Sequence, residues 1–80
     1  EPATYEFWLS AIHPEDRDRI RTSFDQARFA NAMRWEGEYR FQRHDGSYIH
    51  VEDRAYFLRD VNGRAYRTIG SMRDARRAGM

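Results

Sequence analysis

The spacing of apolar residues changes at Trp35, where a helix-like repeat gives way to alternation of apolar and polar side chains. Such alternation is typical of a β-strand with one buried face. Two turn signals, His44-Asp45-Gly46 and Asn62-Gly63, interrupt the pattern, and glycine at these positions is typical of tight hairpin turns. The sequence therefore predicts three antiparallel strands, at about 35–43, 47–60 and 64–74.

The first turn also predicts how the first two strands pair. A three-residue loop, a type I turn with Gly46 in the left-handed region, places Phe41 opposite Ile49 and keeps the apolar residues of both strands on one face. A four-residue loop would place Phe41 opposite His50 and scatter the apolar residues over both faces. We therefore expect the three-residue loop.

The second turn, Asn62-Gly63, predicts a two-residue type I′ turn, which needs a positive φ at both positions. This turn places Val61 opposite Arg64 and Asp53 opposite Met72. The two registers gather one set of side chains on the face that we expect the helices to cover. The set is Tyr39, Phe41, Ile49, Val51, Asp53, Ala55, Phe57, Thr68, Gly70 and Met72.

The residues before Trp35 predict two helices, at about 4–12 and 14–30. The first has apolar residues at the helical spacing i, i+3, i+4 and i+7, namely Tyr5, Trp8, Leu9 and Ile12. His13-Pro14 separates the helices, because proline disfavours a helical residue before it and fits the first position of a new helix. The 80 residues thus predict a single α+β domain with helices packed on a three-stranded sheet.

Composition excludes several classes of function. The chain has no cysteine, which excludes disulfides, thiolate metal sites and cysteine nucleophiles. Fourteen arginines are interleaved with thirteen acidic residues, so we expect no nucleic-acid-binding face. No apolar run approaches the roughly 20 residues of a membrane span. We expect no direct membrane contact and a cytoplasmic location, which includes the cytoplasmic part of a membrane-bound receptor.

The titratable residues give no sign of catalysis. His13, His44 and His50 are spread over a helix start, a turn and a strand, so neither a metal cluster nor a nucleophile-base pair is expected. We expect His13 to cap its helix. The chain is therefore not expected to be an enzyme, and it has no candidate catalytic or metal-binding residues.

Five stretches of the chain, in their order and spacing, resemble the PAS fold family in the form common in bacterial sensory proteins. That form has a His-Pro-acid-Asp-Arg helix start, a Glu-Tyr-Arg strand, two glycine turns and a last strand that ends in aspartate. The matching stretches are Ile12–Arg17, Gly37–Arg40, Asp45–Tyr48, Arg59–Gly63 and Ile69–Asp74. The chain departs from the family at His50, where tryptophan is usual.

The resemblance implies that the chain is the C-terminal two-thirds of a PAS domain, without the first two strands of the usual five-stranded sheet. Truncation and supply of those strands by another chain are both open. The last strand, about 66–74, would then be an edge instead of a central strand. Because an unprotected edge invites pairing, we expect a homodimer or a swapped arrangement through the exposed sheet edge or face.

The resemblance also implies a small-molecule pocket between the inner sheet face and the helix that begins at Pro14. Its candidate lining residues are Phe24, Tyr39, Phe41, Ile49, Val51, Asp53 and Met72. Plain core packing is the alternative for the apolar members. A carboxylate on this face costs on the order of several kcal/mol unless it is paired or hydrated, so Asp53 either touches a ligand or water or finds an arginine.

The cofactor is left unknown by the sequence. Flavin photosensors of the PAS type form an adduct with a cysteine, which this chain lacks. Haem-binding PAS sensors use a histidine on the helix that faces the sheet, and residues 14–30 contain none. The resemblance therefore argues against a flavin photoadduct and against haem.

The opposite face of the sheet carries two further features. Glu52 lies opposite Arg73, near Arg40 and Glu38, which predicts an ionic cluster. Tyr56, Leu58 and Ile69 form an apolar island, which is either a docking surface or part of an ordinary mixed face.

The resemblance implies that Asp74 stands at the junction between the sensor core and an output helix. There it would pair with an arginine and couple the pocket, together with Glu52 and Arg73, to the helix that follows. A plain N-cap for that helix is the alternative.

The function that the resemblance implies is a sensory and dimerisation module within a larger signalling protein of the histidine kinase or diguanylate cyclase type. Such a module changes shape by population shift when a ligand binds, and an output domain of the same chain reads the change. The alternative is a pure protein-protein interaction module with a filled core and no ligand.

Overall fold

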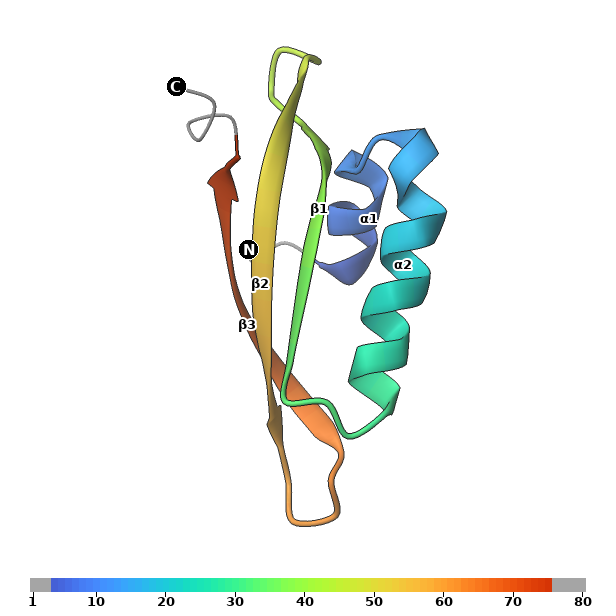
Figure 1. Cartoon of the computed structure of the whole chain (residues 1–80), viewed down its shortest axis with the longest axis vertical. Helices are drawn as coiled ribbons and strands as arrows, with labels where there is room; N and C mark the ends of the chain where they lie inside the picture. Colours follow the sequence, from blue (N-terminus) through green and yellow to red (C-terminus); the bar gives the residue numbers. More distant parts are fainter. Residues whose placement is uncertain (1–3, 76–80) are drawn as a thin grey trace.

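The computed structural model describes residues 4–75 and places two helices on one face of a three-stranded antiparallel sheet (Figure 1). The elements are α1 Tyr5–Ala11, α2 Pro14–Phe29, β1 Arg34–Gln42, β2 Tyr48–Arg59 and β3 Ala65–Asp74. Each bound lies within one residue of the bound expected from the sequence. The strands are ordered β1-β2-β3, so the predicted α+β fold is confirmed. Within residues 4–75 no helix has the length and apolar character needed to cross a membrane.

Local side-chain contacts explain where the helices begin. The Thr4 hydroxyl accepts a hydrogen bond from the Phe7 N–H at 3.0 Å and caps α1. His13 caps α2, as expected, because its Nδ1 accepts from the Glu15 N–H at 3.0 Å. Pro14 fills the first position of α2, where its missing N–H is no loss. The chain therefore leaves one helix and enters the next within two residues.

The first hairpin has the three-residue loop expected from the sequence. Gly46 has a φ of 91°, and Oδ1 of Asp45 accepts a hydrogen bond from the Ser47 N–H at 2.9 Å. Phe41 lies opposite Ile49. The predicted register between β1 and β2 is confirmed.

The second hairpin differs from the prediction of a two-residue type I′ turn. Its loop has three residues, because the Asp60 N–H donates to the Arg64 carbonyl at 2.9 Å. Among the described residues only glycines have a positive φ, so Asn62 lacks the positive φ that a type I′ turn needs. The cause is Asp60, whose Oδ1 accepts from the Asn62 and Arg64 amides at 2.9 Å each and favours a turn with Asn62 at negative φ.

The predicted register is still correct further along the strands, although the turn differs from the prediction. A register shift between Leu58 and Arg59 absorbs the extra loop residue. Beyond it, Asp53 lies opposite Met72, as expected. The expected pairing of Val61 with Arg64 is wrong.

The core lies between α2 and the β1–β2 half of the sheet. It is the buried cluster Ile12, Ile20, Phe24, Trp35, Tyr39, Val51, Ala55 and Phe57. The Phe24 ring packs against Trp8, Trp35 and Phe57 at centroid distances of 5.0, 5.2 and 5.5 Å. A Cβ at Gly37 would lie 2.5 Å from Cζ2 of Trp35, so the missing side chain lets this indole lie flat against β1.

The junction between the helices is bonded to the outer edge of β1. Ile12 forms a β-bridge with Phe41, and the His13 N–H donates to the Arg40 carbonyl at 2.8 Å. Oδ2 of Asp16 accepts from the Arg40 N–H at 2.9 Å and from Nε at 3.0 Å, while Oδ1 accepts from Nη2 at 2.9 Å. Arg40 also reaches Glu15 at 3.2 Å. The start of α2 is thereby fixed to the sheet.

Two other arginines bind backbone carbonyls. Arg17 donates to the carbonyls of Leu9, Ser10 and Ile12 at 2.9 to 3.1 Å and so binds the last turn of α1. Arg59 donates to the carbonyls of Ala27, Arg28, Ala32 and Gly63 at 2.7 to 3.2 Å. Arg59 thus joins the end of α2, the loop into β1 and the second hairpin.

The expectation that the helices cover the whole inner face is wrong at β3. Thr68, Gly70 and Met72 face the helix side but are exposed, Met72 by 39%. Figure 1 shows β3 at the edge farthest from α2. The physical cause is the junction at β1, which holds both helices over the β1 side of the sheet.

Replacing Asp16 with asparagine should lower Tm by roughly 10 °C, because it removes charge-assisted hydrogen bonds that join α2 to β1. Those hydrogen bonds from Arg40 hold the pKa of the Asp16 carboxyl well below its usual range. Asp16 therefore stabilises the fold above the unfolded pKa of about 3.9, and this contribution is lost as pH falls below that value. Thermal unfolding from pH 7 to pH 2.5 should show the gap between wild type and Asp16→Asn closing below about pH 4.

The matched control is Asp18→Asn on the same helix. The Asp18 side chain is 92% exposed and pairs only with Arg21 among the described residues, so its Tm should change by less than about 3 °C. Equal Tm losses in the two variants would contradict the role given to Asp16.

Candidate functional site

A cavity of about 320 Å³ lies between the two helices and the uncovered part of the inner sheet face. We call it the inner cavity. Its walls come from α1, α2, β2 and β3. The lining residues are Thr4, Tyr5, Trp8, Phe24, Arg28, Asp53, Ala55, Thr68 and Gly70.

Asp53 is the buried charged group of the inner cavity, with an exposed fraction of 8%. The Tyr39 hydroxyl donates to Oδ2 of Asp53 at 2.5 Å. The Trp8 indole N–H donates to the Tyr39 oxygen at 2.8 Å. The partner of Asp53 is therefore a tyrosine instead of the arginine considered from the sequence, because alternation along β2 sends its neighbour Arg54 to the opposite face.

The chain of hydrogen bonds from Trp8 through Tyr39 to Asp53 shifts two pKa values. Burial raises the pKa of the Asp53 carboxyl, while the hydrogen bonds from Tyr39 and Trp8 act against this rise. Burial, and then the bond to Asp53, raise the pKa of Tyr39. Tyr39 therefore stays a neutral donor, and Asp53 keeps a proton to higher pH than an ordinary aspartate does.

Tyr5 closes the α1 side of the inner cavity. Its hydroxyl donates to Oδ1 of Asp25 at 2.7 Å. Burial and the Asp25 carboxylate raise the pKa of Tyr5 to about 12. The ring is thus held in place, 6.0 Å from both the Trp8 and Phe24 rings, and the three rings form an aromatic wall.

Two of the seven predicted lining residues, Phe24 and Asp53, meet at the inner cavity. Tyr39 and Val51 are each 1% exposed and pack within the core. Tyr39 still acts at the cavity indirectly, through its bond to Asp53. The other three predicted residues lie elsewhere.

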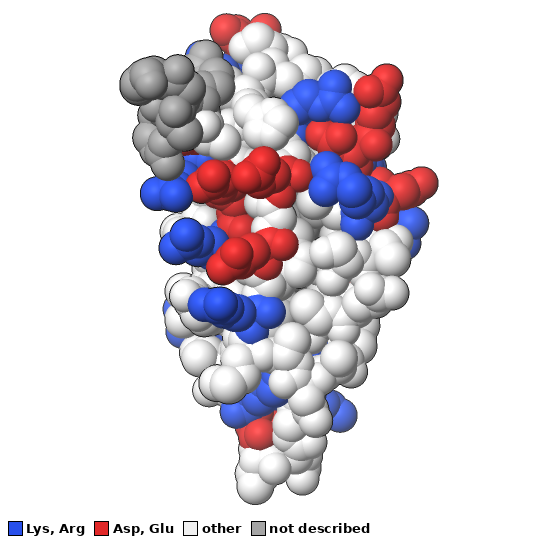
Figure 2. Space-filling model, viewed as in Figure 1, with Lys and Arg blue, Asp and Glu red and all other residues white. Residues whose placement is uncertain are grey.

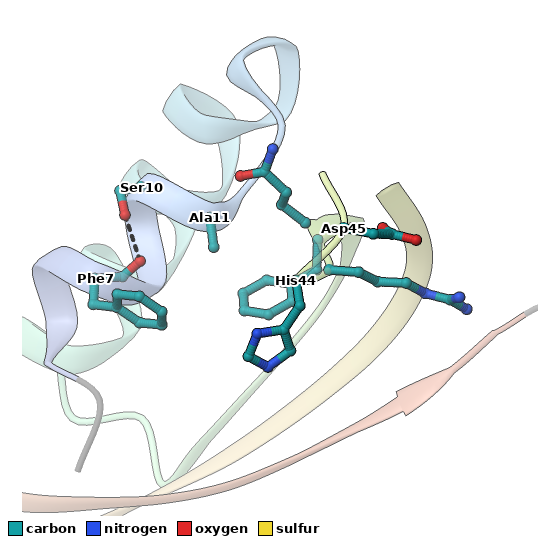
Figure 3. A pocket seen from close by; sticks show the side chains of 8 residues that line it. Phe7, Ser10, Ala11, His44 and Asp45 are labelled. Carbon is teal, nitrogen blue, oxygen red and sulfur yellow. Dashed lines mark hydrogen bonds between the residues drawn. The ribbon is translucent and has the colours of Figure 1, made fainter. Parts of the chain in front are cut away.

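Ile49 is half-buried against the core, and Met72 is exposed on β3. Phe41 lines a second cavity, of about 720 Å³, between α1 and the first hairpin. We call it the hairpin cavity; Figure 3 shows the Phe7 ring on one side of it and His44 and Asp45 on the other. It is the larger of the two, yet none of its charged residues is buried. The inner cavity is the stronger candidate site, because a buried carboxylate and aromatic side chains meet there.

The predicted lining set omitted seven of the nine lining residues: Thr4, Tyr5, Trp8, Arg28, Ala55, Thr68 and Gly70. The helical spacing of Tyr5 and Trp8 did place them on the buried side of α1, so extending the pocket to that helix would have found them. Arg28 gave no such signal, because it lies at the end of a charged helix.

The predicted ionic cluster on the opposite face forms in part. Arg73 pairs with Glu52 at 2.8 Å, and Glu38 lies 3.7 Å from His50. Arg40 does not join them, because it turns around the sheet edge to Asp16. Figure 2 shows acidic and basic side chains next to one another in the upper part of the view, whereas the lower part is mostly uncharged.

The structure places Asp74 at the end of β3, opposite Val51. The helix that Asp74 was predicted to cap would follow it and falls outside the described residues. Its coupling role with Glu52 and Arg73 stays a prediction.

Comparisons with known proteins agree with this architecture. The family model described as the PAS fold matches residues 2–72. No curated protein matches the chain.

Three of the similar solved structures show the extent of the likeness. The N-terminal domain of a diguanylate cyclase with a PAS/PAC sensor from Marinobacter aquaeolei is 26% identical, with a TM-score of 0.86 over 96% of this chain and 70% of that one. A sensory box histidine kinase/response regulator from Burkholderia thailandensis is 25% identical, with a TM-score of 0.76 over 86% of this chain and 52% of that one. A PAS domain from Colwellia psychrerythraea shares the fold, with 24% identity and a TM-score of 0.66 over 82% of this chain and 56% of that one. The chain thus spans about half the length of the last two structures.

Replacing Tyr39 with phenylalanine should destabilise the protein by about 1–2 kcal/mol at pH 7, because the buried Asp53 loses its donor. The pKa of Asp53 should rise further, which carbon-detected NMR titration of its carboxyl would measure. A raised pKa means that the cost of the buried charge disappears as pH falls towards about 4. The stability deficit of Tyr39→Phe should therefore shrink between pH 7 and pH 4.

Tyr56→Phe is the matched control, since Tyr56 is exposed and its hydroxyl makes no hydrogen bond within residues 4–75. It should change stability by less than about 0.5 kcal/mol at every pH. A pH-independent deficit in Tyr39→Phe would argue against the link between Tyr39 and the Asp53 charge.

Proposed function

The chain belongs to the PAS fold family, and from this we propose that it is a sensory module that binds a small ligand in the inner cavity. In this proposal the module itself performs no catalysis and acts in the cytoplasm. It passes its ligand state to an output domain of the same polypeptide, of the histidine kinase or diguanylate cyclase type. Support comes from the two similar structures at 25% and 26% identity, which are parts of a sensory box histidine kinase and of a diguanylate cyclase with a PAS/PAC sensor.

The observation that carries the proposal is the buried Asp53 at the wall of the inner cavity. A carboxylate with an exposed fraction of 8% lowers the stability of the fold unless hydrogen bonds or opposite charges compensate its burial. A residue with such a cost is a candidate for a functional role. Here Tyr39 satisfies one oxygen, and aromatic rings surround the space beside it. Such a combination of apolar walls and a few convergent polar groups is the usual form of a small-molecule site.

Strand β3 offers a route from the inner cavity to the output domain. Thr68 and Gly70 line the cavity, and the same strand ends at Arg73 and Asp74, beside the ion pair with Glu52. A ligand that contacts β3 would favour the strand positions that suit it, which is the differential contact that a population shift needs. In the proposal, Glu52, Arg73 and Asp74 couple the ligand state to the segment that follows.

The second candidate function is a pure protein-protein interaction module. It is favoured by the surface around β3, where the apolar island of Tyr56, Leu58 and Ile69 is exposed and no strand within residues 4–75 pairs with the outer edge. Exposed apolar side chains next to an open edge are suited to association. We propose that this surface mediates a homodimer, which is compatible with either function.

Replacing Thr68 with phenylalanine should block ligand binding, because a larger side chain on β3 would fill the inner cavity. In native mass spectra of protein purified without denaturation, wild type should carry an added small-molecule mass that Thr68→Phe lacks. Ile69→Phe is the matched control, since the neighbouring side chain points to the opposite face, and it should keep the added mass. A wild-type spectrum with the protein mass alone would favour the interaction module.

Replacing Ile69 with glutamate should weaken dimerisation, because it places a charge in the apolar island, where Ile69 is 48% exposed. Sedimentation velocity at high micromolar concentration should show a dimer for wild type and a shift towards monomer for Ile69→Glu. Val61→Glu, at a position 97% exposed in the second hairpin, should leave the dimer unchanged. A wild-type protein that remains monomeric would contradict the proposed association.

A further inference from the structure

The two oxygens of Asp53 have different surroundings. Oδ2 accepts the hydrogen bond from Tyr39, and hydrogen bonding by Trp8 also acts on the carboxyl group. Oδ1 faces β3, 3.8 Å from the point where a Cβ at Gly70 would lie. The inner cavity therefore presents one oxygen of a buried carboxylate to whatever occupies it.

The aromatic wall supplies apolar contact near Asp53. Trp8 and Phe24 lie with their ring centroids 5.0 Å apart, and Tyr5 lies 6.0 Å from each. The Trp8 indole N–H donates to the Tyr39 oxygen, so the indole turns its N–H edge toward the Tyr39–Asp53 pair. A cation at Asp53 would therefore gain from the carboxylate, and an apolar group next to it would gain from the rings.

Arg28 supplies a charge of the opposite sign on another wall of the inner cavity. Its guanidinium lies over the Phe29 ring, 5.2 Å from the centroid, and makes no ion pair with a carboxylate in the described part of the chain. Arg28 and Asp53 do not pair with each other either. A positively charged and a negatively charged residue therefore both line the inner cavity.

The size of the inner cavity suits a small molecule. A volume of about 320 Å³ corresponds to the space of about ten water molecules in the liquid. Gly70 leaves room beside Oδ1, because a Cβ at this position would lie 3.8 Å from that oxygen. An occupant of about ten non-hydrogen atoms fits this space.

We propose that the inner cavity takes a small zwitterion of the amino-acid type, with its ammonium group at Asp53, its carboxylate at Arg28 and an apolar side chain against Trp8 and Phe24. The inference rests on the proposed function, since it names the ligand class of the same cavity. The inference goes beyond the proposed function, because a neutral or singly charged ligand would also suit a sensory module.

The test uses matched probes that differ by one charged group. L-Phenylalanine carries both groups, 2-phenylethylamine lacks the carboxylate and 3-phenylpropionate lacks the ammonium. Binding to the 80-residue chain is followed by shifts of backbone amide resonances in NMR titrations, which also report whether each variant is folded. L-Leucine, with 3-methylbutylamine and 4-methylpentanoate, forms a second series with a smaller side chain.

In at least one series the zwitterion should bind at least tenfold more tightly than either analogue, with the largest shifts around Asp53 and Gly70. Asp53→Asn should weaken the zwitterion and the amine at least tenfold and leave the acid unchanged. Arg28→Gln should weaken the zwitterion and the acid and leave the amine unchanged or improved. Glu36→Gln and Arg67→Gln, which remove exposed charges elsewhere on the sheet, are the controls and should bind as wild type does.

The proposal is overturned if no zwitterion binds with a Kd below 10 mM, or if an analogue binds as tightly as its zwitterion. It is also overturned if folded Asp53→Asn keeps wild-type affinity. Failure of the zwitterion proposal can be told apart from failure of the proposed sensory function, because Thr68→Phe fills the inner cavity and tests binding of any ligand there. Binding of any singly charged probe that Thr68→Phe abolishes would retain the sensor function while rejecting the zwitterion, whereas no probe binding and no purified small-molecule mass would reject both.

Discussion

The ion pair between Asp16 and Arg40 is the constraint on which the rest of this structure depends. It joins the first turn of α2 to the outer edge of β1, with both a charged side chain and a backbone amide of the strand as donors. Because the two helices are connected by only Ile12 and His13, fixing one end of α2 also fixes α1. Both helices are thereby held on the β1 side. The uncovered inner face at β3, and the inner cavity that opens beside it, follow from this placement.

The stretch from Ile12 to Arg17, which carries much of the resemblance to the PAS family, has a structural role at almost every position. Ile12 is fully buried and bridges to β1. His13 caps α2, and Pro14 occupies its first position. Arg17 binds the last carbonyls of α1. The motif therefore specifies a sharp corner between two helices and its attachment to a sheet, and it leaves ligand recognition to residues outside it. A motif of this kind identifies the fold better than it identifies what the fold binds.

The elements, the β1–β2 register, the β2–β3 register away from the second hairpin and the first hairpin could be predicted from the sequence, because alternation, helical spacing and turn residues act over a few positions. Features that depend on tertiary placement could not. The three-residue second loop arises from the carboxylate of Asp60, which outweighs the preference of Asn62-Gly63 for a two-residue turn. The partner of Asp53 depends on Tyr39, which lies 14 residues away along the chain and is itself held by Trp8. The exposure of β3 depends on where the helices are fixed, which no local pattern records. Phe24 and Asp53 were found because their strand and helix faces could be assigned, whereas Arg28 has no periodic signature.

The two edges of the sheet differ in how open they are to pairing with a further strand. The edge of β1 is bonded by Ile12 and His13 of the same chain, while within residues 4–75 the edge of β3 pairs with nothing beyond β2. In the described part of the chain, the edge that is open along its whole length is that of β3, next to Thr68 and Gly70 of the inner cavity. A strand added there would extend the sheet beside the inner cavity, so that strand addition and ligand contact would involve the same strand, β3.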